Sequence, residues 1–297
     1  MVPRVFFVGD HSMVAAPSDA ANEEMYFGAE SVDGIDVLSD VRLNGTSVNG
    51  NVEAEGSVVA TNATVAGTID ATASIEFEDS TAARLRASDN ITLISSTVFS
   101  MVKADGMIMA NRCAQLRQIR AGEFADINAC SLIGSVSAKN HVTLRASVVA
   151  ENVFTGSQAT VINSTINGKF TCLSEHMTIE GSTINTIELK CANIISVLNT
   201  ESGLPGILVR GGSVIGINYE SATSEGVTIN GIPLSECIKA STTRRDDLER
   251  TERIKQILEL KSCVVRDVIF EGGDGEVILS GGSVLHGSVT GGIVRNG

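Results

Sequence analysis

A motif of about seventeen residues recurs through the middle of the chain and restricts the fold more than any other feature. Its clearest marker is a hydroxyl-bearing residue followed by an aliphatic one. The marker occurs at Ser47-Val48, Thr64-Val65, Thr97-Val98, Ser131-Leu132, Ser147-Val148, Thr165-Ile166 and Thr183-Ile184, with weaker forms at Thr81-Ala82 and Cys113-Ala114. Successive aliphatic members are 17, 17, 16, 16, 18, 16, 18 and 18 residues apart. A period this short indicates a solenoid in which each coil contacts only its neighbours.

A second column of the repeat contains only small residues. Its members are Ala54, Ala71, Ala87, Ala104, Ala121, Ala138, Gly156, Cys172 and Cys191. Two independent columns with the same period make a chance pattern improbable. We expect the small residues to stack at a corner where no large side chain fits.

Within one repeat, apolar and polar residues alternate as they do in β-strands. Ile75-Glu76-Phe77 and Val142-Thr143-Leu144 are two examples. The pattern predicts about three short strands and three corners in each coil, with the Ser and Thr markers forming a hydroxyl ladder along one corner. Aromatic residues make up only 4% of the chain and tryptophan is absent, which is typical of a thin core with little room for rings.

These observations predict an all-β fold, a single-stranded right-handed parallel β-helix with triangular coils of about seventeen residues and one inserted α-helix. The alternative is a left-handed helix built on hexapeptides, which requires an aliphatic residue every six positions. Here the spacings within a coil are four and then six, as in Val48, Val52 and Val58. This slippage favours the right-handed form.

One segment, residues 243–261, has a helical rather than a strand pattern. Thr243 and Asp246 resemble a capping box, and acid-first charge pairs follow at a spacing of four. Its apolar stripe comprises Leu248, Ile254, Ile257 and Leu258. We expect this helix to pack on the flank of the solenoid or to present a surface to a partner. The predicted organisation is an N-terminal cap segment at 1–40, β-helix coils at 41–232, a helical insertion at 233–262 and C-terminal coils at 263–297.

Composition limits the partners and the compartment. The formal net charge of −13 over 297 residues argues against nucleic acid as a partner. No apolar run is long enough to cross a bilayer, and the N-terminal residues lack the apolar stretch of a secretory signal. The six cysteines show no metal-binding spacing and are interpreted as reduced thiols. We therefore predict a cytoplasmic protein, with membrane association or export by a signal-less route as alternatives.

No catalytic, cofactor or metal site is predicted. The four histidines, His11, His141, His176 and His286, are scattered and have no nucleophile signature beside them. Glycoside hydrolysis needs two carboxyl groups across the scissile bond, and the acids here do not alternate with bases into such a site. A polysaccharide-active enzyme is therefore the least favoured of three functional classes.

The repeat resembles that of the bactofilins, the polymer-forming cytoskeletal proteins of bacteria. The resemblance covers about residues 41–200 and is carried by Val48-Asn49-Gly50-Asn51-Val52-Glu53-Ala54 and Val65-Ala66-Gly67-Thr68-Ile69-Asp70-Ala71. It implies a right-handed triangular β-helix that assembles end to end into nucleotide-free filaments, often near the membrane. The chain departs from that family in its inserted charged segment and in having only four prolines and no proline-rich tail.

The leading hypothesis is a non-enzymatic structural or scaffold protein that self-associates through its β-helix. The alternative is a binding module, such as an effector, adhesin or assembly factor, that uses a sheet face or the helix at 243–261. The residues expected to make these contacts are Val5, Phe6, Phe7, Val8, Leu248, Ile254, Ile257, Leu258, Val284, Val289 and Ile293.

Overall fold

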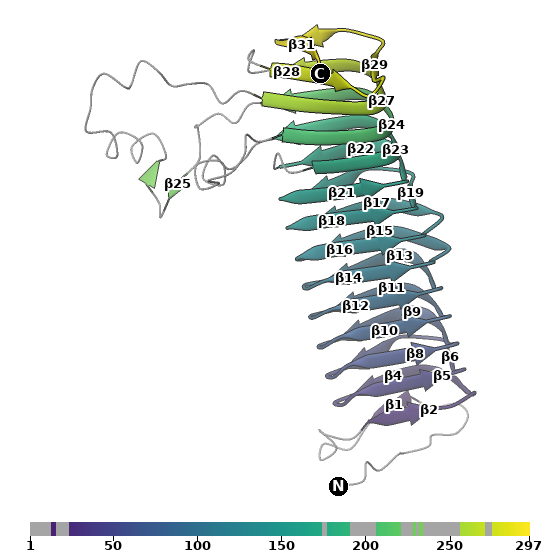
Figure 1. Cartoon of the computed structure of the whole chain (residues 1–297). Helices are drawn as coiled ribbons and strands as arrows, with labels where there is room; N and C mark the ends of the chain where they lie inside the picture. Colours follow the sequence, from purple (N-terminus) through teal and green to yellow (C-terminus); the bar gives the residue numbers. More distant parts are fainter. Residues whose placement is uncertain are drawn as a thin grey trace. The chain divides into compact units, whose positions relative to one another are not determined.

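The computed structural model describes residues 13–15, 24–173, 177–190, 206–220, 228–229, 232–233, 256–270 and 275–297. These residues form an all-β parallel solenoid, and no α-helix occurs among them. Figure 1 labels most of the strands in sequence order. The chain divides into two units. The first comprises Met1–Phe154 with Ser164–Asn167, and the second comprises Thr155–Asn163 with Gly168–Gly297.

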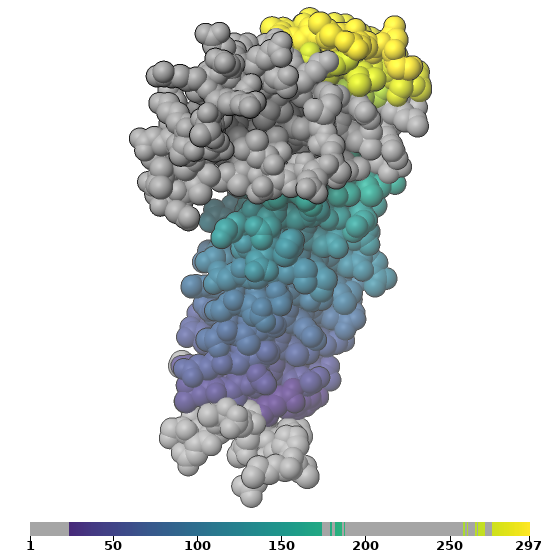
Figure 2. Space-filling view, turned by 60° about the vertical axis from the view of Figure 1, so that its left-hand side comes forward, coloured from purple at the N-terminus to yellow at the C-terminus, as the bar shows by residue number. Residues whose placement is uncertain are grey.

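The first unit has three sides, each a series of parallel strands stacked one coil above another. The first side contains β2 (Met25–Phe27), β5 (Val41–Asn44), β8 (Val58–Thr61), β10 (Ile75–Glu78), β12 (Ile91–Ile94), β14 (Ile108–Asn111), β16 (Phe124–Asn128) and β18 (His141–Arg145). Figure 2 shows the sequence colours of this unit as successive bands from purple to teal, one coil after another.

Longer strands of the first unit bend around a corner. Their first halves belong to the second side and their second halves to the third side. The second side contains β3 (Ser31–Val32), β6 (Ser47–Val48), β19 (Val148–Val149) and the first halves of β9 (Thr64–Ala71), β11 (Thr81–Ala87), β13 (Thr97–Ala104), β15 (Gln115–Ala121) and β17 (Ile133–Ala138). The third side contains β1 (Met13–Ala15), β4 (Gly34–Val37), β7 (Val52–Ala54) and the second halves of the same long strands. The register shifts at the bend, where Ala82 to Arg84 lie opposite Val65 to Thr68. Variation in coil length is absorbed at this bulge.

The interior of the first unit is a set of aliphatic columns, because alternate residues of every strand point inward. Val52, Ile69 and Leu85 follow one another in register on the third side and are fully buried. Burial of one such side chain contributes about 1.5–3 kcal/mol. The core also holds rings, which the composition did not lead us to expect: Phe27 and Phe77 are fully buried.

The predicted column of small residues is confirmed in the first unit. Ala54, Ala71, Ala87, Ala104, Ala121 and Ala138 lie in register in successive coils. In the second unit Thr155, not Gly156, has this place. The Leu173 amide donates to the Thr155 carbonyl over 3.0 Å, the same bond that the Thr72 amide makes to Ala54. Thr155 and Cys172 are both fully buried, and Cys191 lies outside the described residues.

The marker column is displaced by one residue or more in three coils. The buried members are Leu116, Ile133 and Val149, which pair in register, whereas Leu132 and Val148 are exposed. In each pair of adjacent aliphatic residues only one side chain can face inward, because neighbours along a strand point to opposite faces. The marker at Cys113-Ala114 fails for a related reason, since Cys113 itself is buried at the preceding corner.

The predicted cap at 1–40 is wrong over its described part. β1 pairs with β4, and β2, β3 and β4 pair with strands of the next coil. Residues 24–40 therefore form a full coil. Its irregular sequence, with Phe27 in an aliphatic place, hides the repeat, but backbone pairing and burial do not depend on the exact apolar side chain.

The second unit continues with parallel strands. β20 (Val153–Thr155) and β22 (Thr165–Cys172) have residues in both units. The strands wholly within the second unit are β21 (Gln158–Ile162), β23 (Met177–Lys190), β24 (Gly206–Glu220), β27 (Gln256–Phe270), β28 (Gly275–Ser280), β29 (Val284–Leu285), β30 (Val289–Thr290) and β31 (Gly292–Asn296). A short antiparallel hairpin, β25 (Thr228–Ile229) and β26 (Ile232–Pro233), lies between β24 and β27 in sequence.

Two connections in the second unit are much longer than one coil. Met177 pairs with Ile207, a separation of 30 residues (207 − 177), and Ile207 pairs with Leu258, a separation of 51 (258 − 207). Since β24 and β27 are adjacent in the ladder, residues 221–255 are an insertion between neighbouring coils. The helical insertion predicted at 233–262 is wrong at its C-terminal end, because residues 256–262 belong to β27, and residues 234–255 lie outside the described residues.

The predicted helix at 243–261 is wrong over residues 256–261, which belong to β27. Leu258 and Leu260 alternate inward and are fully buried, and β27 pairs with β24 on one side and β28 on the other. Two ladders of backbone hydrogen bonds outweigh a local helical preference. Residues 243–255 lie outside the described residues.

Candidate functional site

One corner of the first unit is built from a left-handed residue followed by a buried small one. The left-handed residues are Gly45, Asn62, Asp79, Ser95, Arg112, Ala129 and Ala146. Their successors are Thr46, Ala63, Ser80, Ser96, Cys113, Cys130 and Ser147, each at most 3% exposed. The left-handed turn directs the next side chain into the corner, so only a small residue fits there.

The buried hydroxyls of this corner connect one coil to the next. The Ser96 hydroxyl donates to the Ile94 carbonyl over 2.8 Å and accepts the Ser80 amide over 3.2 Å. Ser147 does the same with the Arg145 carbonyl, at 2.7 Å, and the Cys130 amide, at 3.1 Å. A hydroxyl ladder was predicted one residue later, at the markers Ser47, Thr64 and Thr97. These three markers instead lie on the outer surface, half-buried or exposed, whereas the marker Ser147 is itself a buried member of the corner.

Two thiols replace hydroxyls in the middle of this corner. The Cys113 and Cys130 sulfurs donate to the carbonyls of Asn111 and Asn128, over 3.6 and 3.4 Å. The Cys130 thiol can turn its single proton to the Cys113 sulfur instead, and this hydrogen bond lowers the pKa of Cys113 to about 7 against the opposing effect of burial. The same hydrogen bond, together with burial, raises the pKa of Cys130. Cys113, Cys130 and Cys172 are free thiols, as predicted.

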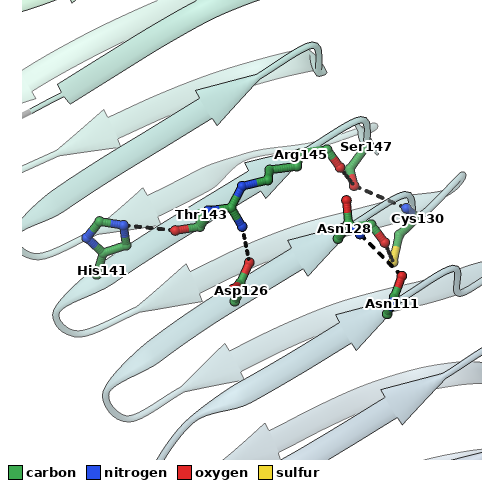
Figure 3. A network of polar contacts seen from close by, with 8 residues as sticks. All are labelled: Asn111, Asp126, Asn128, Cys130, His141, Thr143, Arg145 and Ser147. Carbon is green, nitrogen blue, oxygen red and sulfur yellow. Dashed lines mark hydrogen bonds and ion pairs between the residues drawn. The ribbon is translucent and has the colours of Figure 1, made fainter.

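Beside the thiols, the outer face of the first side carries a network of polar contacts (Figure 3). Arg145 Nη1 donates to Asp126 Oδ1 over 3.0 Å, and Asn128 Nδ2 donates to Asn111 Oδ1 over 3.3 Å. Each contact joins β16 to a neighbouring strand of the same side, so the network connects adjacent coils. The Arg145 and Asp126 side chains are 47% and 48% exposed, and such a pair contributes little to stability.

The same face places His141 at its far end from Cys130 (Figure 3). His141 Nε2 lies 2.9 Å from the Thr143 hydroxyl. Nucleophilic catalysis requires an accessible nucleophile and a base that a third group orients. Thr143 is only 8% exposed, and Asp126, its neighbour in register, is engaged by Arg145. The arrangement therefore supports packing of β18 rather than a reaction.

No three or more His, Cys, Asp or Glu side chains come together as metal ligands in the described ranges. Within those same ranges, no helix has the length and apolar character needed to cross a membrane.

The interaction residues predicted from the sequence differ in where they lie and in how exposed they are. Val5, Phe6, Phe7, Val8, Leu248 and Ile254 lie outside the described residues. Leu258 is wrong as a contact residue, because its side chain is fully buried in β27, and Ile257 belongs to the same strand. Val284 and Ile293 are 42% and 51% exposed, and Val289 is half-buried. Val284 and Val289 belong to the coil after β27, whereas Ile293 belongs to β31, which lies on β28 in the following coil.

The C-terminal coil is incomplete: it begins with β31, which pairs with β28 of the coil before it, and it exposes an interior column of the solenoid. Leu258, Val277 and Val294 lie in register in β27, β28 and β31. The first two are fully buried, but Val294 is 44% exposed. The contact residues named from the sequence do not include Val294, although its place 17 residues after Val277 identifies it as the interior one. Val284 and Ile293 lie in register with Val264 and Glu276, beside the interior columns. The exposed edge that carries Val284, Ile293 and Val294 is hereafter the terminal apolar surface.

No family model matches this chain, and neither the curated proteins nor the solved structures include one that is significantly similar to it.

Proposed function

We propose that this chain is a non-enzymatic structural or scaffold protein that self-associates end to end through its β-solenoid. The observation that carries this proposal is the terminal apolar surface, where the column of Leu258 and Val277 continues into exposed Val294. A strand edge that is flanked by exposed aliphatic side chains is a template for pairing with another chain. A second copy would supply the next coil of the ladder.

The finer parts of the proposal follow the resemblance to bactofilins. The solenoid winds to the right, and copies join into filaments without a bound nucleotide. The protein works in the cytoplasm and near the membrane, with export by a signal-less route as the alternative. A solenoid is suited to such a role, because each added coil or copy repeats the same backbone contacts at a rise of about 4.8 Å.

Substitution of the terminal apolar surface tests this proposal. Ile293→Lys places a charge on it, and Leu132→Lys is the matched control, because Leu132 is 49% exposed on the wall of the first unit. We expect purified wild-type protein and L132K to form elongated particles in electron micrographs and I293K to form short ones. Monodisperse wild-type monomers in sedimentation velocity at high concentration would contradict end-to-end association.

A second candidate is a binding module, and the insertion at 221–255 favours it. Adjacent coils β24 and β27 do not need these residues to pair. Deletion of 222–254 with a short glycine linker should leave the β-sheet circular dichroism unchanged. A binding module would then lose its partner, whereas a self-associating scaffold would still assemble.

A further inference from the structure

One outward column on the third side of the first unit sorts its charges by sign. β4, β7, β9, β11, β13 and β15 each contribute one residue to it. In order along the column these are Asp36, Glu53, Asp70, Arg86, Lys103 and Arg120. Three acids are followed by three bases, and every side chain is exposed or half-buried. We call this set the charge column.

The order of the charges does not stabilise the fold of a single, isolated chain. Neighbours in the column are about 4.8 Å apart, and like charges facing each other on adjacent strands are destabilising. An alternating order would create an ion pair between every two coils. The observed order allows one such contact, between Arg86 Nη1 and Asp70 Oδ2 at 3.6 Å. Lys103 has a further acid within its own coil, Asp105, at 3.7 Å.

The column is complementary to itself after a half-turn. We propose that two copies of this chain pair side by side and antiparallel through the charge column. A two-fold axis between the coils of Asp70 and Arg86 places Asp70 opposite Arg86 of the second copy. It also places Glu53 opposite Lys103 and Asp36 opposite Arg120.

Such pairing satisfies both halves of the column at once. Each contact occurs twice because the interface is isologous, which gives six ion pairs. All six fit together because both copies have the same rise per coil. A polyanion, in contrast, would engage only the basic half and would be repelled by the acidic half and by the net charge of −13.

This inference deepens the proposed self-association and rests on it for the identity of the partner, while using a different surface. End-to-end contact through β31 extends an assembly, and the charge column joins assemblies laterally. Salt screens exposed ion pairs once the Debye length is shorter than the distance between the charges. The Debye length falls from about 10 Å at 0.1 M salt to about 3 Å at 1 M. The lateral contact is therefore expected to be salt-sensitive.

A charge exchange across the proposed interface tests it. Glu53→Lys and Lys103→Glu each turn two of the six attractive pairs into repulsive ones. We expect either variant to weaken the association constant at least about tenfold in sedimentation velocity at low salt. The double variant E53K/K103E restores every pair, so its association should return to within about threefold of the wild type. Glu76→Lys, on the first side, is the matched control and should have no effect.

The outcomes separate this inference from the proposed function. Loss of association in E53K, recovery in E53K/K103E and persistence of the salt-sensitive species in I293K support lateral pairing. Unchanged association in E53K, or no recovery in the double variant, overturns it, and end-to-end growth can still stand. Tighter binding of E53K to anionic vesicles without a change in self-association overturns it in favour of a membrane surface. Circular dichroism of every variant establishes that the coils remain folded.

Discussion

The coils of the first unit and the C-terminal coil build the same parallel ladder but protect it differently. In the first unit, interior residues such as Ile69 have a coil on either side and are fully buried. In β31, Val294 occupies an interior column yet is 44% exposed. The corners differ as well: residues such as Asn62 and Ala129 adopt the left-handed conformation in the first unit, whereas Gly281, Gly282 and Gly291 do so near the C-terminus. Backbone pairing alone therefore does not define a stable coil; cover on both sides does.

The largest test of this comparison is an identical substitution in both regions. Ile69→Ala should lower the free energy of unfolding by about 3 kcal/mol, because it leaves a cavity in a fully buried column. Ile293→Ala, at a side chain that is 51% exposed, should change it by less than about 0.5 kcal/mol. Urea denaturation at a protein concentration below that of self-association measures both. A large effect of I293A in the monomer would show that the terminal coil is covered in solution.

The buried corner hydroxyls should give the next largest effect. Ser96→Ala removes the acceptor of the Ser80 amide and a donor to the Ile94 carbonyl, in a place that is 1% exposed. We expect a loss of about 1–3 kcal/mol, because the amide is left unsatisfied in the interior. Ser88→Ala is the control, since Ser88 is exposed. Equal urea midpoints for S96A and the wild type would mean that water replaces the hydroxyl.

At the left-handed corners, an alanine-to-glycine substitution and a glycine-to-alanine substitution should change the stability in opposite directions. Ala129→Gly, at a φ of 54°, should stabilise the chain by about 0.5 kcal/mol, since the relief of strain exceeds the added entropy of the unfolded state. Gly282→Ala, at a φ of 78° with open space around the new methyl group, should destabilise it by about 1 kcal/mol. Thermal unfolding of both variants measures the difference, and a shared sign would refute this account of the corner.

The thiol pair predicts a pH-dependent effect that is confined to the first unit. Cys113 loses its proton at a pKa of about 7 in the folded state and 9.0 in the unfolded state. The unfolded chain therefore binds more protons between these values, so the free energy of unfolding should rise with pH from about 7 to 9. Cys130→Ala removes the hydrogen bond that lowers the pKa of Cys113 and should abolish this rise. Ultraviolet absorbance of the thiolate, with Cys113→Ser as the reference, follows the titration directly.

The fold was predictable at positions that admit only one kind of residue. It was not predictable where two neighbouring residues, or two kinds of secondary structure, suit the local sequence equally well. Ala54 to Ala138 could be assigned because the corner admits only small side chains. Leu132-Ile133 and Val148-Val149 each offer two aliphatic residues, and the register of the neighbouring coil selects the second. Residues 256–261 suit a helix or a strand locally, and only the distant partner β24 decides between them.

The charge column was missed for a different reason. The sequence was searched for acids and bases that alternate, since alternation builds stable ion pairs and catalytic sites. The informative pattern is the opposite one, three acids followed by three bases at the spacing of one coil. Its meaning emerges only after registers such as Glu53 with Asp70 and Lys103 with Arg120 are known.

The bulge near Ala82 has a consequence for how such chains can change over time. Because the register shift lets a coil of one length lie against a coil of another, gain or loss of a residue there leaves both flanking ladders intact. Most folds propagate a deletion as a frameshift of every later contact. Here the bend accommodates the extra or missing residue. Mutation can therefore alter the length of one coil while the residues on either side keep their register.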